Sequence, residues 1–271
     1  MLGIGDLHVE HGENRDVVDH LRPQSEGDWL IVCGDVADDP ENVEWALRLL
    51  RERFTKVIWA PGNHELHSRS VELRGERLYR RLVEICRCLD VVTPEDPYPV
   101  WDGADGPVRV ASLFLLYDYS FGSNVGATRE EALRRAYEAG VVCSDEFLLH
   151  PDPYPSRQAW CEARVRETER RLSADGDLPT VLVNHFPLLV EPTRVLRHPE
   201  FAQWCGTVRT ADWHRRFGAV ATVYGHLHIP RTTWHDGVRF EEVSLGYPRE
   251  RRYRRAGAYA PRRILPEAAH A

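Results

Sequence analysis

The sequence predicts an α/β fold, because short apolar runs alternate along the chain with amphipathic segments. The apolar runs favour strands at Leu2–Gly5, Trp29–Cys33, Lys56–Ala60, Val108–Leu116, Thr180–Val183, Val220–Tyr224 and Arg239–Leu245. Helical patterns lie between them, at Val43–Arg53, Leu73–Cys88, Thr128–Ala139 and Ser156–Leu172. With 271 residues the chain can form one large domain, or one domain with a sizeable insertion.

The first predicted strand, Leu2–Gly5, is short, since a core strand usually has about five or six residues. This indicates either that the true start codon lies upstream of Met1 or that the first strand is clipped and has a weak edge. The second strand, Trp29–Cys33, is predicted to be buried, so that the Cys33 thiol behaves as a small hydrophobe.

The first predicted helix has a regular apolar face. Val43, Ala46, Leu47 and Leu50 follow the i, i+3, i+4, i+7 spacing of one side of a helix. The last predicted helix begins at Ser156, a residue suited to an N-cap.

Near the C-terminus, Arg231–Trp234 and Arg239–Val243 flank a segment that contains Asp236-Gly237, a typical hairpin turn. We therefore expect this part of the chain to add antiparallel strands.

The stretch between Glu65 and Asn184 contains aromatic and proline-rich segments, Leu116–Phe121 and His150–Pro155, that resemble loops over an active site. We therefore predict a single domain over residues 1–248, with an insertion or cap within about residues 70–175, and an arginine-rich C-terminal tail over residues 249–271. Such a tail is most often solvated, but it could also meet an acidic partner.

Composition excludes several classes of protein. The net charge of −7 argues against general nucleic-acid binding. The six cysteines include no CxxC or paired zinc spacing, so we expect them to be reduced. No apolar stretch approaches the roughly 20 residues that span a bilayer, and the start leaves no room for a signal peptide, which predicts a cytoplasmic protein without a membrane partner.

Polar motifs directly follow the apolar runs, where a strand passes into a loop. All of them offer carboxylate, amide or imidazole ligands and none offers a thiolate, which suits Mn, Fe or Zn. These motifs are Asp6-Leu7-His8, Gly34-Asp35, Gly62-Asn63-His64-Glu65, Asn184-His185 and Gly225-His226-Leu227-His228.

The motifs suit a centre with two metal ions. Asp6 and His8 are two positions apart, so in an extended segment both face one cation. The carboxylate of Asp35 has two oxygens and can bridge two cations, while Gly34 permits a close approach of the backbone and the metal. Two cations roughly 3.5–4 Å apart can bind a phosphate and generate a bridging hydroxide that attacks phosphorus in line. His64, next to the ligand Asn63, is the candidate for protonating the leaving group.

The order of these motifs closely resembles that of the calcineurin-like metallophosphoesterases. The resemblance implies a four-layer αββα sandwich of two mixed β-sheets, with the site at the strand ends. It also implies two divalent metal ions, Mn first and Fe or Zn as alternatives, and a contact of His64 with phosphate. The first ion would take Asp6, His8, Asp35 and His228, and the second Asp35, Asn63, His185 and His226.

A finer resemblance is to the actinobacterial 4′-phosphopantetheinyl hydrolases, which remove the phosphopantetheine arm from acyl carrier proteins. Hydrolysis of the serine–phosphate bond would give the apo-carrier protein, and the acidic carrier could dock on the arginines of the tail. The blocks that carry this resemblance are Asp28–Val32, Phe114–Phe121, Trp204–Thr207, Gly225–Thr233 and Ser244–Arg249.

Other functions remain open at this stage. A phosphoesterase that acts on a small nucleotide or another soluble phosphodiester fits the same metal site. A nuclease is disfavoured by the acidic balance, and a binding module with a degenerate site is disfavoured by the intact motifs. The sequence does not predict an oligomeric state.

Further residues are candidates for supporting roles. Asp38 could orient a ligand or act as a carboxylate at a helix N-terminus. His11 and His67 lie close to ligands but match no family ligand position. Tyr117, Asp118 and Tyr119 could line the substrate cleft or serve in packing, and Arg194 and His198 could face a phosphate but are more often solvated loop residues.

Overall fold

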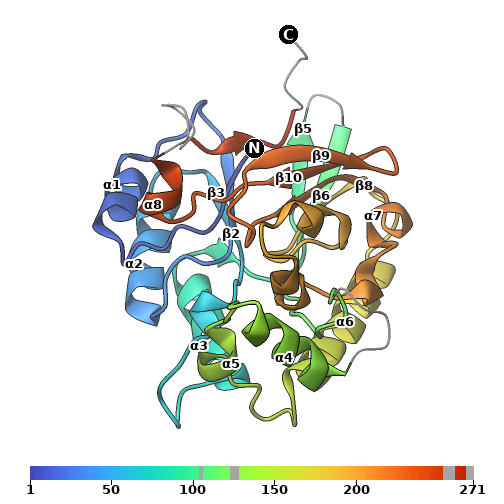
Figure 1. The fold of residues 1–271 in the computed structure, drawn as a ribbon. Helices are drawn as coiled ribbons and strands as arrows, with labels where there is room; N and C mark the ends of the chain where they lie inside the picture. The colour runs from blue at the N-terminus through green and yellow to red at the C-terminus, as the bar shows by residue number, and fades with distance from the viewer. Residues whose placement is uncertain (104–105, 123–127, 253–259, 267–271) are drawn as a thin grey trace.

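The computed structural model describes residues 1–103, 106–122, 128–252 and 260–266, and its strands form two mixed sheets (Figure 1). The first sheet has the order β11-β1-β2-β3-β4, in which only β11 runs antiparallel to its neighbour. Its strands are β1 (Leu2–Ile4), β2 (Trp29–Cys33), β3 (Lys56–Ala60), β4 (Val91–Val92) and β11 (Arg262–Arg263).

The second sheet has the order β5-β6-β7-β8-β10-β9, with four parallel strands in the middle and an antiparallel strand at each edge. Its strands are β5 (Val100–Gly103), β6 (Gly106–Ser112), β7 (Thr180–Val183), β8 (Ala219–Tyr224), β9 (Arg231–His235) and β10 (Val238–Glu242). The predicted hairpin is confirmed: β9 and β10 pair in antiparallel register around Asp236 and Gly237, which both have positive φ.

The two sheets pack face to face. Alternate residues of each strand point to opposite sides, so that one set faces the other sheet and the other set faces the helices. Ile31 and Cys33 of β2 lie in the same apolar cluster as Val181 and Val183 of β7. Their neighbours in sequence, such as Val32 of β2, pack instead in the larger cluster on the helical side. The central strands β2, β3 and β7 are buried on both faces and are therefore continuous apolar runs, which is why the sequence identified them.

Helices flank the two sheets on opposite sides, α1 and α2 beside the first sheet and α6 and α7 beside the second (Figure 1). The predicted αββα sandwich is therefore confirmed. The helices are α1 (Gly12–His20), α2 (Pro40–Arg51), α3 (Glu76–Cys88), α4 (Arg129–Glu138), α5 (Asp145–Leu148), α6 (Arg157–Ala174), α7 (Trp213–Arg216) and α8 (Pro248–Arg251), with 3₁₀ turns η1 (His64–Leu66), η2 (Glu191–Val195), η3 (Pro199–Trp204) and η4 (Val208–Thr210).

Several local predictions hold, and others differ at the ends. Ser156 caps α6, its side chain accepting a hydrogen bond from the amide of Ala159 at 3.1 Å. The predicted strand Val108–Leu116 is displaced, since β6 ends at Ser112. The sequence did not identify α1, whose buried residues within the helix are only Asn14 and Val18.

The N-terminal strand is short, as predicted, but it is not an edge. β1 pairs with β2 on one side and with β11 on the other, where Leu2 lies opposite Arg263. Ile264, which follows β11, is fully buried. Part of the segment predicted as a tail therefore completes the first sheet, while Arg254 and Arg255 lie outside the described residues.

None of the helices in the described part of the chain combines the length and the apolar character needed to cross a bilayer. Where the insertion begins and ends remains a prediction. The segment contains sheet and helix, including β6 and α6, and its short helix α5 reaches the functional site described below.

Candidate metal centre

The predicted ligands lie at the carboxyl ends of strands from both sheets. The sheets meet here, because Gly5 after β1 exchanges hydrogen bonds with the segment after β10, accepting from Leu245 at 2.7 Å and donating to Val243 at 3.0 Å. Asp6 and His8 follow β1, and Asp35 follows β2. The remaining predicted ligands are Asn63 after β3, His185 after β7, and His226 and His228 after β8.

The backbone at these strand ends is strained. Asp6, His8, Asp35, His226 and His228 have φ values of 51°, 42°, 50°, 68° and 54°, in the left-handed region. Non-glycine residues rarely occupy this region, at a cost on the order of 1–3 kcal/mol each, and such residues cluster at functional sites. In this backbone conformation, side chains from different strands point towards a common site.

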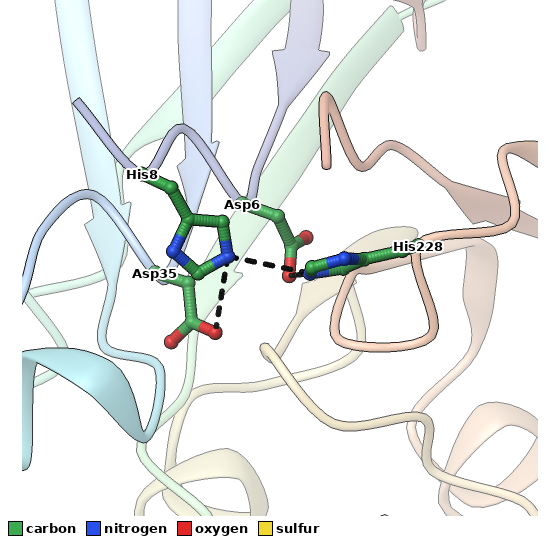
Figure 2. A group of neighbouring side chains, drawn as sticks. All are labelled: Asp6, His8, Asp35 and His228. Atoms are coloured by element: carbon green, nitrogen blue, oxygen red, sulfur yellow. Dashed lines mark hydrogen bonds and ion pairs between the residues drawn. The ribbon is translucent and has the colours of Figure 1, made fainter. Parts of the chain in front are cut away.

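One group of ligands consists of Asp6, His8, Asp35 and His228, whose donor atoms all lie within 4.8 Å of one another (Figure 2). The Nε2 atom of His8 is 3.3 Å from Nε2 of His228 and 3.9 Å from a carboxylate oxygen of Asp35. Nε2 of His228 is in turn 3.1 Å from a carboxylate oxygen of Asp6.

A second group consists of Asp35, His185 and His226, with Asn63 beside it. The Nε2 atom of His185 lies 3.4 Å from a carboxylate oxygen of Asp35 and 3.2 Å from the amide oxygen of Asn63. Asp35 belongs to both groups, which is the geometry predicted for a carboxylate that bridges two cations.

The hydrogen bonds of the histidines in these groups leave their Nε2 atoms available to bind metal ions. His185 directs Nδ1 at the carbonyl of Cys33 at 3.0 Å, and His228 directs Nδ1 at the carboxylate of Glu250 at 2.8 Å. Both partners only accept, so the neutral rings carry their hydrogen on Nδ1 and turn the Nε2 lone pair towards other acceptors. The buried Nε2 of His226 has no hydrogen-bond partner among the described residues. When these rings are neutral, as metal ligation requires, their lone pairs converge on positions that a cation would occupy.

The carboxylates control the charge of the imidazoles. Burial acts to lower the pKa of His185, but the negative charge and hydrogen bond of Asp35 outweigh it and raise the pKa to about 10. For His228, burial is likewise outweighed by Asp6, and its pKa is raised to about 10. Burial lowers the pKa of His226 to about 3, and His185 adds to this effect. Without cations, the carboxylates therefore keep His185 and His228 protonated, whereas His226 is neutral.

Metal binding is consequently expected to release about two protons at pH 7, one each from His185 and His228, because a ligating imidazole must be neutral. The apparent metal affinity should rise with pH between 7 and 10, since protons compete less as pH approaches the pKa of these rings. Calorimetric titration of the metal-free protein with Mn²⁺, in buffers of different ionisation enthalpy, measures the released protons. A heat that is the same in every buffer would contradict the prediction.

Glu65 links the loop that carries Asp35 to the loop that carries Gly62 and Asn63. It is fully buried and accepts hydrogen bonds from the backbone amides of Asp35 at 2.8 Å, Val36 at 3.1 Å and Gly62 at 3.0 Å. The indole of Trp59 donates a further bond at 3.2 Å. The sequence placed Glu65 in a motif without a role, because its function depends on amides that only the fold brings together.

The glycines of the motifs allow close approach to the ligands. A Cβ atom on Gly62 would lie 2.0 Å from Oδ1 of Asp35, and one on Gly225 would lie 2.2 Å from Oδ2 of Asp6. No side chain can be accommodated at such distances unless the carboxylate moves. For Gly34 the sequence predicted a close approach of the backbone to a metal. The structure shows a close approach to a proposed ligand, since a Cβ on Gly34 would lie 2.6 Å from Nδ1 of His185.

Gly62→Ala is therefore expected to displace Asp35, lower metal occupancy and destabilise the fold by about 1–3 kcal/mol, the usual cost of overpacking. Metal analysis and thermal unfolding measure both effects. Gly12→Ala is the matched control, because a Cβ at Gly12 meets nothing within 4 Å. Equal metal content in the two variants would refute the close-approach role of Gly62.

His64 lies at the open side of the two groups. Its Nδ1 is 2.6 Å from a carboxylate oxygen of Asp38, and its Nε2 is 4.0 Å from Asp35. Burial acts to lower the pKa of His64, but the charges of Asp35 and Asp38 raise it to about 9. Asp38 thus contacts His64, which is not one of the predicted ligands, and the residue that caps the following helix α2 is Asp39.

The structure adds three residues for which the sequence predicted no role. The ring of Tyr247 stacks on His8 with centroids 4.4 Å apart, and its hydroxyl is 3.4 Å from Nε2 of His64. Glu250 orients His228, as described above. Asp145 from α5 accepts a hydrogen bond from Asn63 at 2.9 Å. None of these contacts had a local sequence signal.

The remaining candidates have different surroundings, and of these His67 lies beside the centre, with its ring centroid 4.5 Å from that of His64. Tyr117 is buried, and the hydroxyl of Tyr119 donates to Glu146 at 2.7 Å, which places both rings in the packing of the cap. Arg194 is exposed and pairs with Glu191, and His198 is also exposed. His67 contacts Asp145 rather than a ligand of either group.

The family model of the calcineurin-like phosphoesterases matches residues 1–230. The whole chain is 53% identical to the acyl-carrier-protein phosphodiesterase PptH of Mycobacterium tuberculosis and covers 85% of that protein. The crystal structure of phosphopantetheinyl hydrolase (PptH) from Mycobacterium tuberculosis matches with a TM-score of 0.95 at 52% identity, covering 100% of this chain and 97% of that one. The crystal structure of TT1561 from Thermus thermophilus shares the fold alone, with a TM-score of 0.52 at 13% identity over 89% of this chain and 87% of that one. The chain belongs to the calcineurin-like phosphoesterase family of metal-dependent phosphoric ester hydrolases.

Proposed function

We propose that this enzyme hydrolyses the phosphodiester that joins 4′-phosphopantetheine to the serine of a holo-acyl carrier protein. The observation that carries the chemistry is the pair of buried ligand groups that share Asp35. The identity of 53% over the whole chain to an acyl-carrier-protein phosphodiesterase supports the choice of substrate.

We assign one metal ion to the group of Asp6, His8, Asp35 and His228. The second ion would be held by Asp35, Asn63, His185 and His226. The ligand set is of oxygen and nitrogen only, which suits Mn first and also Fe or Zn. Bound divalent cations activate water and neutralise the charge that develops on the phosphoryl oxygens.

The protein's own residues position the reaction around that site. In the proposed reaction the oxygen of water forms a bond to phosphorus, and the bond from phosphorus to the serine oxygen breaks. The attacking water gives up a proton to solvent, and this balances the later reprotonation of His64. The serine oxygen leaves as an alkoxide and needs a proton, which His64 supplies from Nε2 while Asp38 holds its Nδ1. The products are the apo-carrier protein, with a free serine hydroxyl, and 4′-phosphopantetheine.

Exposed arginines beside the site suit an acidic carrier protein. Arg249 and Arg252 are exposed and follow Tyr247, which touches the first ligand group. Arg262 and Arg263 are engaged elsewhere, with Glu241 and Gln24 respectively. The docking role predicted for the tail is therefore proposed for Arg249 and Arg252 among the described residues, and the cytoplasmic location stays a prediction.

The test is incubation of the purified enzyme and Mn²⁺ with a holo-acyl carrier protein, followed by intact-mass analysis. We expect the carrier to lose the mass of 4′-phosphopantetheine and the Asp35→Asn enzyme to leave it unchanged. An unchanged carrier, alongside turnover of a generic phosphodiester or a nucleotide, would reject the carrier substrate and favour a small soluble phosphodiester. Binding of oligonucleotides that weakens with salt would instead revive the nuclease hypothesis.

A further inference from the structure

Asp145 connects the cap to the proposed ligand Asn63. It is the first residue of α5, is fully buried, and lies 82 positions from Asn63 in the chain. Its Oδ1 atom accepts hydrogen bonds from Nδ2 of Asn63 at 2.9 Å and from Nε2 of His67 at 2.8 Å. A side chain from the cap therefore touches the amide group of a residue in the metal centre.

Hydrogen-bond chemistry gives this contact a direction. An ionised carboxylate only accepts hydrogen bonds, whereas an asparagine amide has an oxygen on one side and an NH₂ group on the other. The carboxylate of Asp145 therefore selects the orientation in which Nδ2 of Asn63 faces the cap. The oxygen of Asn63 then faces Nε2 of His185, 3.2 Å away, on the side of the second ligand group.

The opposite orientation would be useless for binding a cation. It would turn the NH₂ group of Asn63 towards His185 and Asp35, and an amide nitrogen that carries two hydrogens has no lone pair for a metal. The backbone of Asn63 does not remove this ambiguity, because rotation of the terminal amide exchanges the two groups without moving the chain.

We propose that Asp145 is a positioning residue, which fixes the amide of Asn63 so that its oxygen faces the second metal ion. This inference rests on the proposed ligand role of Asn63. It assigns part of the cap to the metal centre, because α5 must be seated before the amide is oriented.

The seat of α5 is built by contacts that do not involve Asn63. The amide of Ser68 donates to the carbonyl of Leu148 at 2.9 Å. The next residue of α5, Glu146, binds Arg129 at 2.7 Å and Arg157 at 3.0 Å and accepts from the indole of Trp204 at 2.9 Å. Glu146 thus offers a neighbouring carboxylate that holds the cap without touching the metal centre.

The experiment titrates the metal-free, full-length protein with Mn²⁺ by calorimetry, with electron paramagnetic resonance to detect paired ions. In Asp145→Ala we expect the weaker Mn²⁺ site to lose about 10–100-fold in affinity, as for other residues that orient a ligand, and the tighter site to stay unchanged. Glu146→Gln is the matched control, because glutamine keeps the length of the side chain and an oxygen that accepts from Trp204 and the arginines, so that α5 stays seated. We expect this variant to bind both ions like the wild type.

A second background separates positioning from simple support of the cap. Asn63→Asp presents a carboxylate oxygen in either orientation and needs no partner to select one. Adding Asp145→Ala to Asn63→Asp should therefore not weaken the second site, whereas a structural role would weaken it in both backgrounds. If Asp145→Ala does not fold, Asp145→Leu replaces it in the same comparison, since leucine fills the space without accepting a hydrogen bond.

Three results would decide the matter. Wild-type Mn²⁺ binding in Asp145→Ala, or an equal loss in Glu146→Gln, would overturn the inference. An equal loss on adding Asp145→Ala to Asn63→Asp would overturn it as well. Failure of the proposed ligand role of Asn63 looks different, because Asn63→Ala would then keep both Mn²⁺ ions at wild-type affinity, and failure of the proposed reaction would show only in the intact mass of the carrier.

Discussion

Replacement of Asp35 by asparagine is expected to lower kcat/KM by at least about 10³-fold and to reduce the binding of both metal ions. Asp35 is the residue common to the two ligand groups, so its loss affects both. Asparagine keeps the size of the side chain but offers one oxygen and two N–H donors, and thus cannot bridge two cations. Cations stabilise such a transition state by several kcal/mol, and each 1.4 kcal/mol corresponds to tenfold in rate.

Metal analysis after gel filtration, together with turnover of bis(p-nitrophenyl) phosphate, measures both consequences. Asp39→Asn is the matched control, since it is the same chemical change four residues along. The carboxylate of Asp39 caps α2 by accepting from the amide of Asn42 at 2.9 Å, a role that asparagine also fills. Two tightly bound ions and normal turnover in Asp35→Asn would exclude the bridging role.

The residues proposed as ligands could be picked out from the sequence because their signals are local. Each ligand follows an apolar run, and the carboxyl ends of parallel strands in one sheet lie at the same edge. The type of residue at each strand end then narrows the chemistry to hard and borderline cations. That reasoning located Asp6, Asp35 and His185 without any knowledge of the fold.

The residues that orient those ligands could not be found in the same way. Asp145 meets Asn63 across 82 positions. Glu250 meets His228 across 22 positions, from the short helix α8, which lies at the start of the predicted tail. A carboxylate in a loop has no local pattern that distinguishes an orienting partner from a solvated charge. Only the seating of the cap and of α8 brings these groups to the ligands.

The lack of a local signal also explains why helix α1 was not predicted. Residues 12–20 form α1, but the buried residues in this helix are Asn14 and Val18, which give too weak an apolar stripe to predict a helix. Asn14 is buried because its side-chain amide donates to the carbonyl groups of Leu7 and Gly246, at 2.7 and 3.1 Å. A polar residue that links two loops of the metal centre has no hydrophobic signature.

The second large effect is expected for His64→Ala, which should retain both metal ions and lose about 10²–10⁴-fold in rate on the carrier substrate. His64 lies beside the two ligand groups that share Asp35 but belongs to neither of them. The loss should be only a few-fold on bis(p-nitrophenyl) phosphate, because p-nitrophenolate leaves without a proton. Parallel assays of the two substrates, with metal analysis, measure this difference, and His20→Ala on the exposed surface is the control.

The pH dependence provides an independent check on the same proton. In the proposed reaction the protonated form of His64 is the active one, so activity on the carrier substrate should fall as pH rises through the pKa of His64. That pKa is raised to about 9 by Asp35 and Asp38 against the effect of burial, and cations bound to Asp35 would bring it lower. The alkaline limb should be absent for the p-nitrophenyl substrate and in His64→Ala. Undiminished turnover of the carrier by His64→Ala, with both ions bound, would show that the leaving serine takes its proton from elsewhere.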